Sequence, residues 1–140
     1  MSDPYNLQRF VTAQSGTYAA ALAEIRAGRK TSHWMWFIFP QIAGLGRSAM
    51  AQLYAIGGAD EARAYLDHPL LGERLRECTE ALNALRVPDA EAIFGGTDAM
   101  KLKSSLTLFD TMSRPAGPFD LCLARYFGGA RDAATLHLLG

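Results

Sequence analysis

Helix start and stop signals recur along the whole chain, and they constrain the fold more than any other feature of the sequence. Capping residues such as Ser48, Asp89 and Asp132 precede apolar residues at helical spacing, and glycines such as Gly28 and Gly128 follow such runs. No stretch shows sustained alternation of apolar and polar residues, and no Asn-Gly or Asp-Gly hairpin signal occurs. The sequence therefore predicts an all-α fold of about seven to nine helices.

Prolines and further capping residues predict where other helices begin. Asp3, which is followed by a proline, predicts an N-cap with proline at the first helical position. The same signals place caps at Asp60 and at Thr97 or Asp98. Pro69 is expected to open the longest helix, whose apolar stripe is typical of a bundle-packing face. The stripe consists of Leu71, Leu75, Cys78, Leu82 and Leu85.

The chain is long enough for one hydrophobic core and too short for two ordinary domains. Its mass of 15.2 kDa predicts a folded surface of roughly 7,000 Å², with about two-thirds of the unfolded surface buried. We therefore expect residues 1–140 to form a single domain.

The charge balance and the apolar runs exclude several classes of partner. Lys+Arg and Asp+Glu both number 14, and this neutral balance argues against non-specific binding to nucleic acid or to anionic membranes. The longest apolar run, residues 34–39, is too short to span a bilayer, and the N-terminus lacks the pattern of a signal peptide. Cys78 and Cys122 lie in helical patterns and form no CxxC pair, which predicts buried free thiols. We therefore expect a cytoplasmic protein.

Residues 34–39 form the most unusual segment, because two tryptophans and two phenylalanines occupy six positions. A helix here, capped by Thr31 or Ser32 and ended by Pro40, would be apolar on every side and would fit only a central, buried position. A strand would need partners that the sequence does not offer, so we interpret the segment as helical. Either the segment is simply core, or part of it forms the aromatic wall of a pocket. That wall would be lined by His33, Trp34, Trp36 and Gln41.

The glycine loop that follows, residues 44–49, matches the GxGxxA dinucleotide fingerprint, but the βαβ unit that gives this motif its meaning is missing. A glycine loop before a capped helix still presents free backbone N–H groups. Arg47 stands beside them, and the combination suits phosphate or carboxylate binding. The alternative is a turn followed by an ordinary N-cap at Ser48.

A third feature lies on a later helix, where Lys101 shares one side with Ser104 and Ser105. The lysine precedes the serines, so the order is not the Ser-x-x-Lys order of serine acylases, and no base is assigned to a serine nucleophile. The alternative is a solvated lysine with hydroxyls that bond to helix carbonyls. The three histidines are far apart and match no metal motif, so we expect neither a metal nor a cofactor.

Four blocks of the sequence resemble the signature blocks of the bacterial DUF1810 family. They are residues 32–41, residues 44–46 with Ser48, residues 65–69 and residues 101–105. The resemblance covers almost the whole chain and implies an all-helical bacterial protein, without implying an activity.

A fainter similarity links Thr31-Ser32-His33-Trp34, the aromatic residues after it and Gln41 to the NADAR family. Members of that family remove ADP-ribose from nucleobases. The family has a glutamate directly before the histidine, whereas this chain has Ser32 there. The similarity implies chemistry related to ADP-ribose, but without that acidic group.

These observations predict one polar and aromatic pocket that binds a small anionic ligand, nucleotide-like or phosphorylated. An ADP-ribose-related N-glycosidase-like enzyme is the catalytic form of this hypothesis. The alternative is a non-catalytic protein-interaction or structural module, in which the same residues are core. The sequence leaves open whether the chain is an enzyme and whether it forms homo-oligomers. The expected ligand-binding residues are His33, Trp34, Trp36, Gln41, Arg47, Ser48, Lys101, Ser104 and Ser105.

Overall fold

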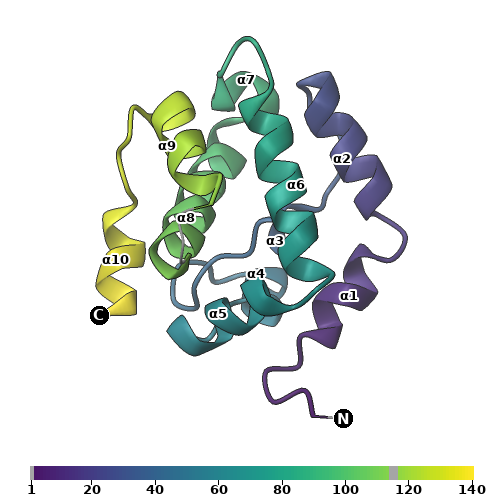
Figure 1. Ribbon diagram of the computed structural model, residues 1–140, viewed down its shortest axis with the longest axis vertical. Coiled ribbons are helices and arrows are strands. Elements are labelled where there is room, and N and C mark those ends of the chain that lie inside the picture. The colour runs from purple at the N-terminus through teal and green to yellow at the C-terminus, as the bar shows by residue number, and fades with distance from the viewer. Residues whose placement is uncertain (1, 114–116) are drawn as a thin grey trace.

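A computed structural model describes residues 2–113 and 117–140, and this part of the chain contains ten α-helices and no strand (Figure 1). The all-α prediction is confirmed. Three helices have only four or five residues, which is why the count exceeds nine. The helices are α1 (Gln8–Gln14), α2 (Tyr18–Ala27), α3 (Met35–Ile38), α4 (Ala49–Leu53), α5 (Ala59–Asp67), α6 (Leu71–Asn83), α7 (Ala90–Phe94), α8 (Gly96–Met112), α9 (Phe119–Phe127) and α10 (Ala133–Leu139).

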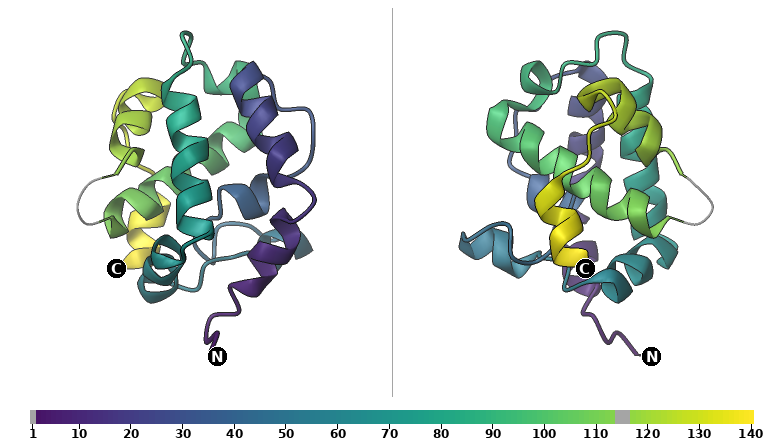
Figure 2. Two further views of the ribbon diagram at one scale, coloured as in Figure 1. Left: turned by 45° about the vertical axis from the view of Figure 1, so that its right-hand side comes forward. Right: turned by 90° about the vertical axis from the view of Figure 1, so that its left-hand side faces the viewer.

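Two helices organise the packing of the others. Helix α6 packs against α2, α5 and α9, and helix α8 packs against α3, α5, α7, α9 and α10. In Figure 1 and Figure 2, α6 runs through the middle of the molecule, with α2 on one side and α9 on the other. Helix α8 has 17 residues and α6 has 13, so the expectation that the helix after Pro69 would be the longest is wrong.

Both ends of α6 are capped by side chains that lie outside it. At the N-terminus, His68 Nδ1 accepts hydrogen bonds of 3.2 Å from the backbone N–H groups of residues 70 and 71. At the C-terminus, the guanidinium of Arg125 donates to three backbone carbonyls in residues 82–85. These bonds satisfy carbonyls that the end of a helix leaves without an intrahelical partner, and α6 ends at Asn83.

Three predicted side-chain caps are confirmed, because each accepts a hydrogen bond from the backbone N–H three residues later. These caps are Ser48, Asp89 and Asp132. Two further predicted positions, Asp60 and Thr97 or Asp98, are wrong. Gly58 caps α5 in place of Asp60, and Gly95 caps α8 in place of Thr97 or Asp98. Helix α8 therefore begins early enough to include Asp98 in its first turn, where the carboxylate is available to lysines.

Asp3 acts as a cap, but from further away than predicted. Its carboxylate accepts hydrogen bonds of 2.8 and 3.0 Å from the backbone N–H groups of Leu7 and Gln8, and these bonds lower the pKa of the carboxyl. The residues between form a turn in which Asn6 has a φ of 50°. Helix α1 consequently begins at Gln8 rather than at the proline.

The aromatic segment is central and buried, as predicted. Trp34 and Phe39 have an exposed fraction of 0%, and both rings pack edge-on against Phe94. The segment forms only one helical turn, α3, and neither Thr31 nor Ser32 caps it. Both residues bind Glu24 of α2 instead.

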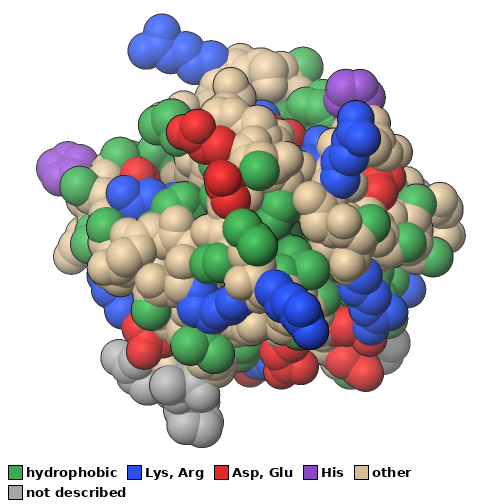
Figure 3. All heavy atoms as spheres, turned by 90° about the horizontal axis from the view of Figure 1, so that it is seen from above, with side chains coloured by type: hydrophobic (Ala, Val, Ile, Leu, Met, Phe, Trp, Pro, Cys, Tyr) green, Lys and Arg blue, Asp and Glu red, His purple; other side chains and the backbone are tan. Residues whose placement is uncertain are grey.

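The two cysteines are free and buried, as predicted, and burial raises the pKa of each thiol to about 12. None of the described helices is long and apolar enough to cross a membrane. On the face shown in Figure 3, basic and acidic side chains are interspersed around hydrophobic ones.

Candidate functional site

Six side chains from α2, the loop after it, α3 and the start of α8 meet on one side of the core. We call this group the lysine–tryptophan cluster. Its members are Glu24, Lys30, Trp34, Trp36, Asp98 and Lys101.

The two lysines of the cluster share one carboxylate and each covers an indole ring. Lys30 Nζ lies 2.9 Å from one oxygen of Asp98, and Lys101 Nζ lies 3.6 Å from the other. The Lys30 ammonium is 5.0 Å from the centroid of the Trp34 ring, and that of Lys101 is 5.1 Å from the centroid of the Trp36 ring. Both distances are within the range of a cation–π interaction.

Glu24 holds the loop that leads into the cluster. Its carboxylate accepts hydrogen bonds from Thr31 N at 2.7 Å, Ser32 N at 2.9 Å, Ser32 Oγ at 2.7 Å and Trp34 Nε1 at 3.0 Å. Desolvation acts to raise the pKa of this carboxyl, but the hydrogen bonds outweigh it and lower the pKa to about 2. Glu24 is therefore ionised at neutral pH and cannot serve there as a proton donor.

The structure brings three of the nine predicted site residues into this cluster. Trp34 is fully buried and its indole N–H is bound by Glu24, whereas Trp36 is half-buried under the Lys101 ammonium. His33 is exposed on the adjoining loop.

The two predicted serines lie on the buried side of α8. Ser104 Oγ donates to the Met100 carbonyl at 3.1 Å, which is the helix-bonding alternative for that residue. Ser105 has an exposed fraction of 0%, and its hydroxyl has no hydrogen-bond partner among the described residues. Neither hydroxyl forms a hydrogen bond with Lys101 in the described structure.

The glycine loop is a tight turn in front of α4. Gly44 has a φ of +105°, and a Cβ on Gly46 would lie 2.5 Å from the Ala51 Cβ, so backbone conformation explains the first glycine and packing explains the second. Gln41 lines a cavity of about 180 Å³ beside this loop. Arg47 is exposed, and no hydrogen bond or ion pair between described residues joins it to the lysine–tryptophan cluster.

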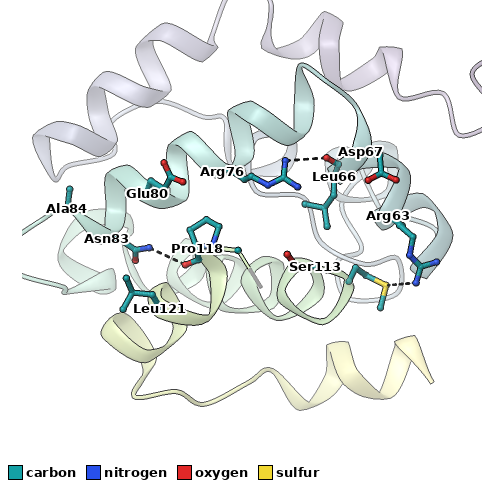
Figure 4. Close-up of a pocket in the computed structure, with 12 residues that line it drawn as sticks. Arg63, Leu66, Asp67, Arg76, Glu80, Asn83, Ala84, Ser113, Pro118 and Leu121 are labelled. Atoms are coloured by element: carbon teal, nitrogen blue, oxygen red, sulfur yellow. Dashed lines mark hydrogen bonds between the residues drawn. The ribbon is translucent and has the colours of Figure 1, made fainter. Parts of the chain in front are cut away.

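A larger cavity, of about 910 Å³, lies on another side of the molecule between α5, α6 and the start of α9 (Figure 4). We call it the α6 groove. Leu66, Met112 and Pro118 contribute apolar surface, and Arg76, Glu80 and Asn83 line it from α6. Sequence reasoning missed this groove, although the i, i+4, i+7 spacing of the three α6 residues marks a polar face beside the predicted leucine stripe.

Comparison with known proteins places the chain in a family. The family model described as "Protein of unknown function (DUF1810)" matches residues 4–139. The chain belongs to the DUF1810 family. This DUF1810 chain is similar to the conserved hypothetical protein Rv1873 from Mycobacterium tuberculosis, with 49% sequence identity, 98% of each chain covered and a TM-score of 0.96. A search of the curated proteins found no match. The fainter NADAR similarity stays a prediction.

The structure shows what several residues do in two of the sequence blocks that resemble the DUF1810 family. In residues 65–69, Tyr65 is buried and bound by Gln14, and His68 caps α6. In residues 101–105, Leu102 and Ser105 are buried, while Lys101 reaches the tryptophans. Most of these DUF1810 residues therefore serve the fold, and Lys101 and Trp36 remain partly open to solvent.

Proposed function

We propose that this protein binds a small anionic ligand, nucleotide-like or phosphorylated, at the open side of the lysine–tryptophan cluster. One observation carries the proposal: the Lys101 ammonium, on a side chain that is 24% exposed, lies over the half-buried ring of Trp36. A cation beside an aromatic surface suits a phosphate attached to an aromatic or sugar group.

The pairing within the cluster supports Lys101 as the ligand-binding cation. Lys30 is only 9% exposed, pairs with Asp98 at 2.9 Å and donates to the Ser32 carbonyl at 2.6 Å. Lys101 is the more distant partner of Asp98, at 3.6 Å, so moving its ammonium to an incoming anion would cost less interaction energy than moving that of Lys30. Exposed His33 adds a further polar group on the adjoining loop.

The proposed site keeps His33, Trp34, Trp36 and Lys101 from the sequence prediction. Trp34 would serve as the buried support of the wall rather than as a stacking surface, because its exposed fraction is 0%. Arg47 and Ser48 belong to the glycine loop and Gln41 lines the cavity beside it, so the three would contribute only to a ligand long enough to reach that loop.

An ADP-ribose-related N-glycosidase-like activity is the catalytic form of this proposal. Departure of a base from a sugar needs stabilisation of charge or transfer of a proton. This chain has no glutamate directly before His33, but Glu24 bonds to the same segment from α2. With a pKa of about 2, Glu24 could stabilise developing positive charge and could not protonate the base.

A thermal-shift screen tests the proposal, with sulfate, common nucleotides, phosphosugars and ADP-ribose as probes. A ligand at about 100 times its Kd adds about 2.7 kcal/mol to the free energy of unfolding, which raises Tm by several degrees in a chain of this size. We expect the shift in the wild type and in Lys103→Ala, and its loss in Lys101→Ala. Lys103 is the matched control because it lies on the same helix and is also half-buried.

Two results would contradict the proposal. One is a ligand-induced shift that Lys101→Ala leaves unchanged, and the other is a flat screen with every probe. Loss of the shift in Arg47→Ala as well would extend the site to the glycine loop.

The second candidate function is a non-catalytic interaction or structural module. It is favoured by the full burial of Trp34 and Ser105, and by Leu136 and Leu138 of α10, which are 39% and 42% exposed. A flat screen would favour this function. The free, buried thiols of Cys78 and Cys122 support a reducing, cytoplasmic location under either proposal.

A further inference from the structure

We propose that the α6 groove is a second binding site, and that its ligand is a short apolar peptide with free amino and carboxyl ends. Its volume of about 910 Å³ is within the range of small-molecule sites in proteins. The site is independent of the lysine–tryptophan cluster, with which it shares no residue.

One end of the groove offers hydrogen-bond donors without an ionic partner. Arg76 is half-buried, and among the described residues its guanidinium makes a single hydrogen bond of 3.3 Å, to the Leu66 carbonyl (Figure 4). No acidic group among the described residues forms an ion pair with it. A guanidinium held in this way presents a planar fork that fits a carboxylate.

The other end of the groove offers acceptors. Glu80 has no ion-pair or hydrogen-bond partner in the described part of the chain. Beside it, Asn83 donates to the Pro118 carbonyl at 3.1 Å, and its buried Oδ1 has no partner among the described residues. An ammonium group of the ligand would be attracted to this end.

Apolar side chains form part of the groove lining. Leu66 is buried under the groove, and Leu121 stands on its rim with an exposed fraction of 53%. In Figure 4, Leu66 lies beside Arg76 and Leu121 lies beside Asn83, so an apolar side chain of the ligand would cover apolar surface near either end. The exposed carboxylates of Asp67 and Glu80 repel a doubly charged phosphate in the same position more strongly than a singly charged carboxylate.

The length of the groove-lining stretch of α6 sets the size of the peptide. From Arg76 the helix rises about 6 Å to Glu80 and about 10 Å to Asn83, at about 1.5 Å per residue. An extended peptide of three residues spans about 10 Å. We therefore expect a tripeptide to reach from the guanidinium to the acceptors.

Isothermal titration calorimetry with the tripeptide Ala-Leu-Ala tests this site. The probes are the free peptide, its C-terminal amide and its N-acetyl form. On the wild type we expect the free peptide to bind, and each blocked form to bind about tenfold more weakly, because each loses one charge-assisted interaction. In Arg76→Gln, amidation should cause no further loss, and in Glu80→Gln, acetylation should cause no further loss.

Arg86→Gln is the control, because Arg86 is exposed on the loop after α6 and does not line the groove. It should bind all three peptides as the wild type does, and thermal melts should show that each variant is folded. The proposal is overturned if the wild type does not bind the free peptide at millimolar concentration. It is equally overturned if amidation weakens binding to Arg76→Gln as much as it weakens binding to the wild type.

Discussion

The lysine–tryptophan cluster and the α6 groove differ in how their charged groups are satisfied. In the cluster, Lys30 and Asp98 form a close pair, and Glu24 accepts four hydrogen bonds. In the groove, Arg76 makes one hydrogen bond to a carbonyl, and Glu80 makes none with a described residue. The closely paired charges of the cluster hold parts of the fold together, whereas the charges of the groove have no ionic partner among the described residues and are proposed to meet a ligand.

This difference in pairing follows from how far each region removes its charged groups from water. A buried charge is costly unless it is paired, so the charges beside Trp34 had to find partners within the protein. Charges that line an open groove keep part of their hydration and tolerate the absence of a partner. In the cluster the fully buried Trp34 therefore supports the fold, while residues of more common types line the larger cavity.

The largest effect on stability is expected from removing the buried indole ring of Trp34 from the cluster. We expect Trp34→Ala to lower the free energy of unfolding by about 3–5 kcal/mol, because a wholly buried ring is lost and its cavity remains. Trp36→Ala is the matched control and should cost about 1 kcal/mol, because this ring is already partly in water. Urea denaturation measures both, and equal effects would contradict the distinction between the two tryptophans.

The second-largest effect is expected when the buried Lys30 ammonium is removed and its alkyl chain is kept. Lys30→Met should destabilise the protein by about 2 kcal/mol, since Asp98 loses its closer partner and keeps only Lys101. Lys103→Met, on a lysine without a described ion pair, should change the stability by less than about 0.5 kcal/mol. Denaturation curves that coincide for the two variants would show that the pairing contributes nothing.

The contribution of Glu24 should depend on pH. Its pKa is lowered from 4.5 to about 2 in the folded protein, so its stabilising effect is complete above pH 4.5 and is lost as the pH falls towards 2. Glu24→Gln should cost about 1 kcal/mol at pH 7, less than the full pKa shift implies because the carboxylate is partly solvated. Unfolding measured at several pH values should show a flatter profile for the variant below pH 4.5, and parallel profiles would contradict the assignment.

The smallest effect is expected in the groove. Arg76→Gln should change the free energy of unfolding by no more than about 0.5 kcal/mol, because only one hydrogen bond is lost. Arg125→Gln, which uncaps α6, should cost about 2 kcal/mol. A large loss in Arg76→Gln would assign Arg76 to the fold rather than to a ligand, and would weaken the contrast between the two regions.

Local signals in the sequence predicted the helices well. The caps at Ser48, Asp89 and Asp132 act over three residues, so the sequence contains both partners of each bond. The predicted N-termini of α5 and α8 were wrong because the N-cap residues, Gly58 and Gly95, have no side chain that could identify them as caps in the sequence. The basic residues at the end of α2, Arg26, Arg29 and Lys30, were a signal that could have pointed to Lys30 as a site residue. Its ionic partner could not be found in this way, because Asp98 is 68 positions further along the chain.

The sequence by itself determined the all-α class, the buried aromatic segment and the free buried thiols, because spacing and hydrophobicity act within one or two helical turns. Only the tertiary structure decided which charges meet. The loop after α2 lies beside the start of α8 and pairs Lys30 with Asp98, and the arrangement of α5, α6, α9 and the end of α8 forms the groove beside Arg76. Contacts across such long separations depend on how whole helices pack, which no short pattern in the sequence records.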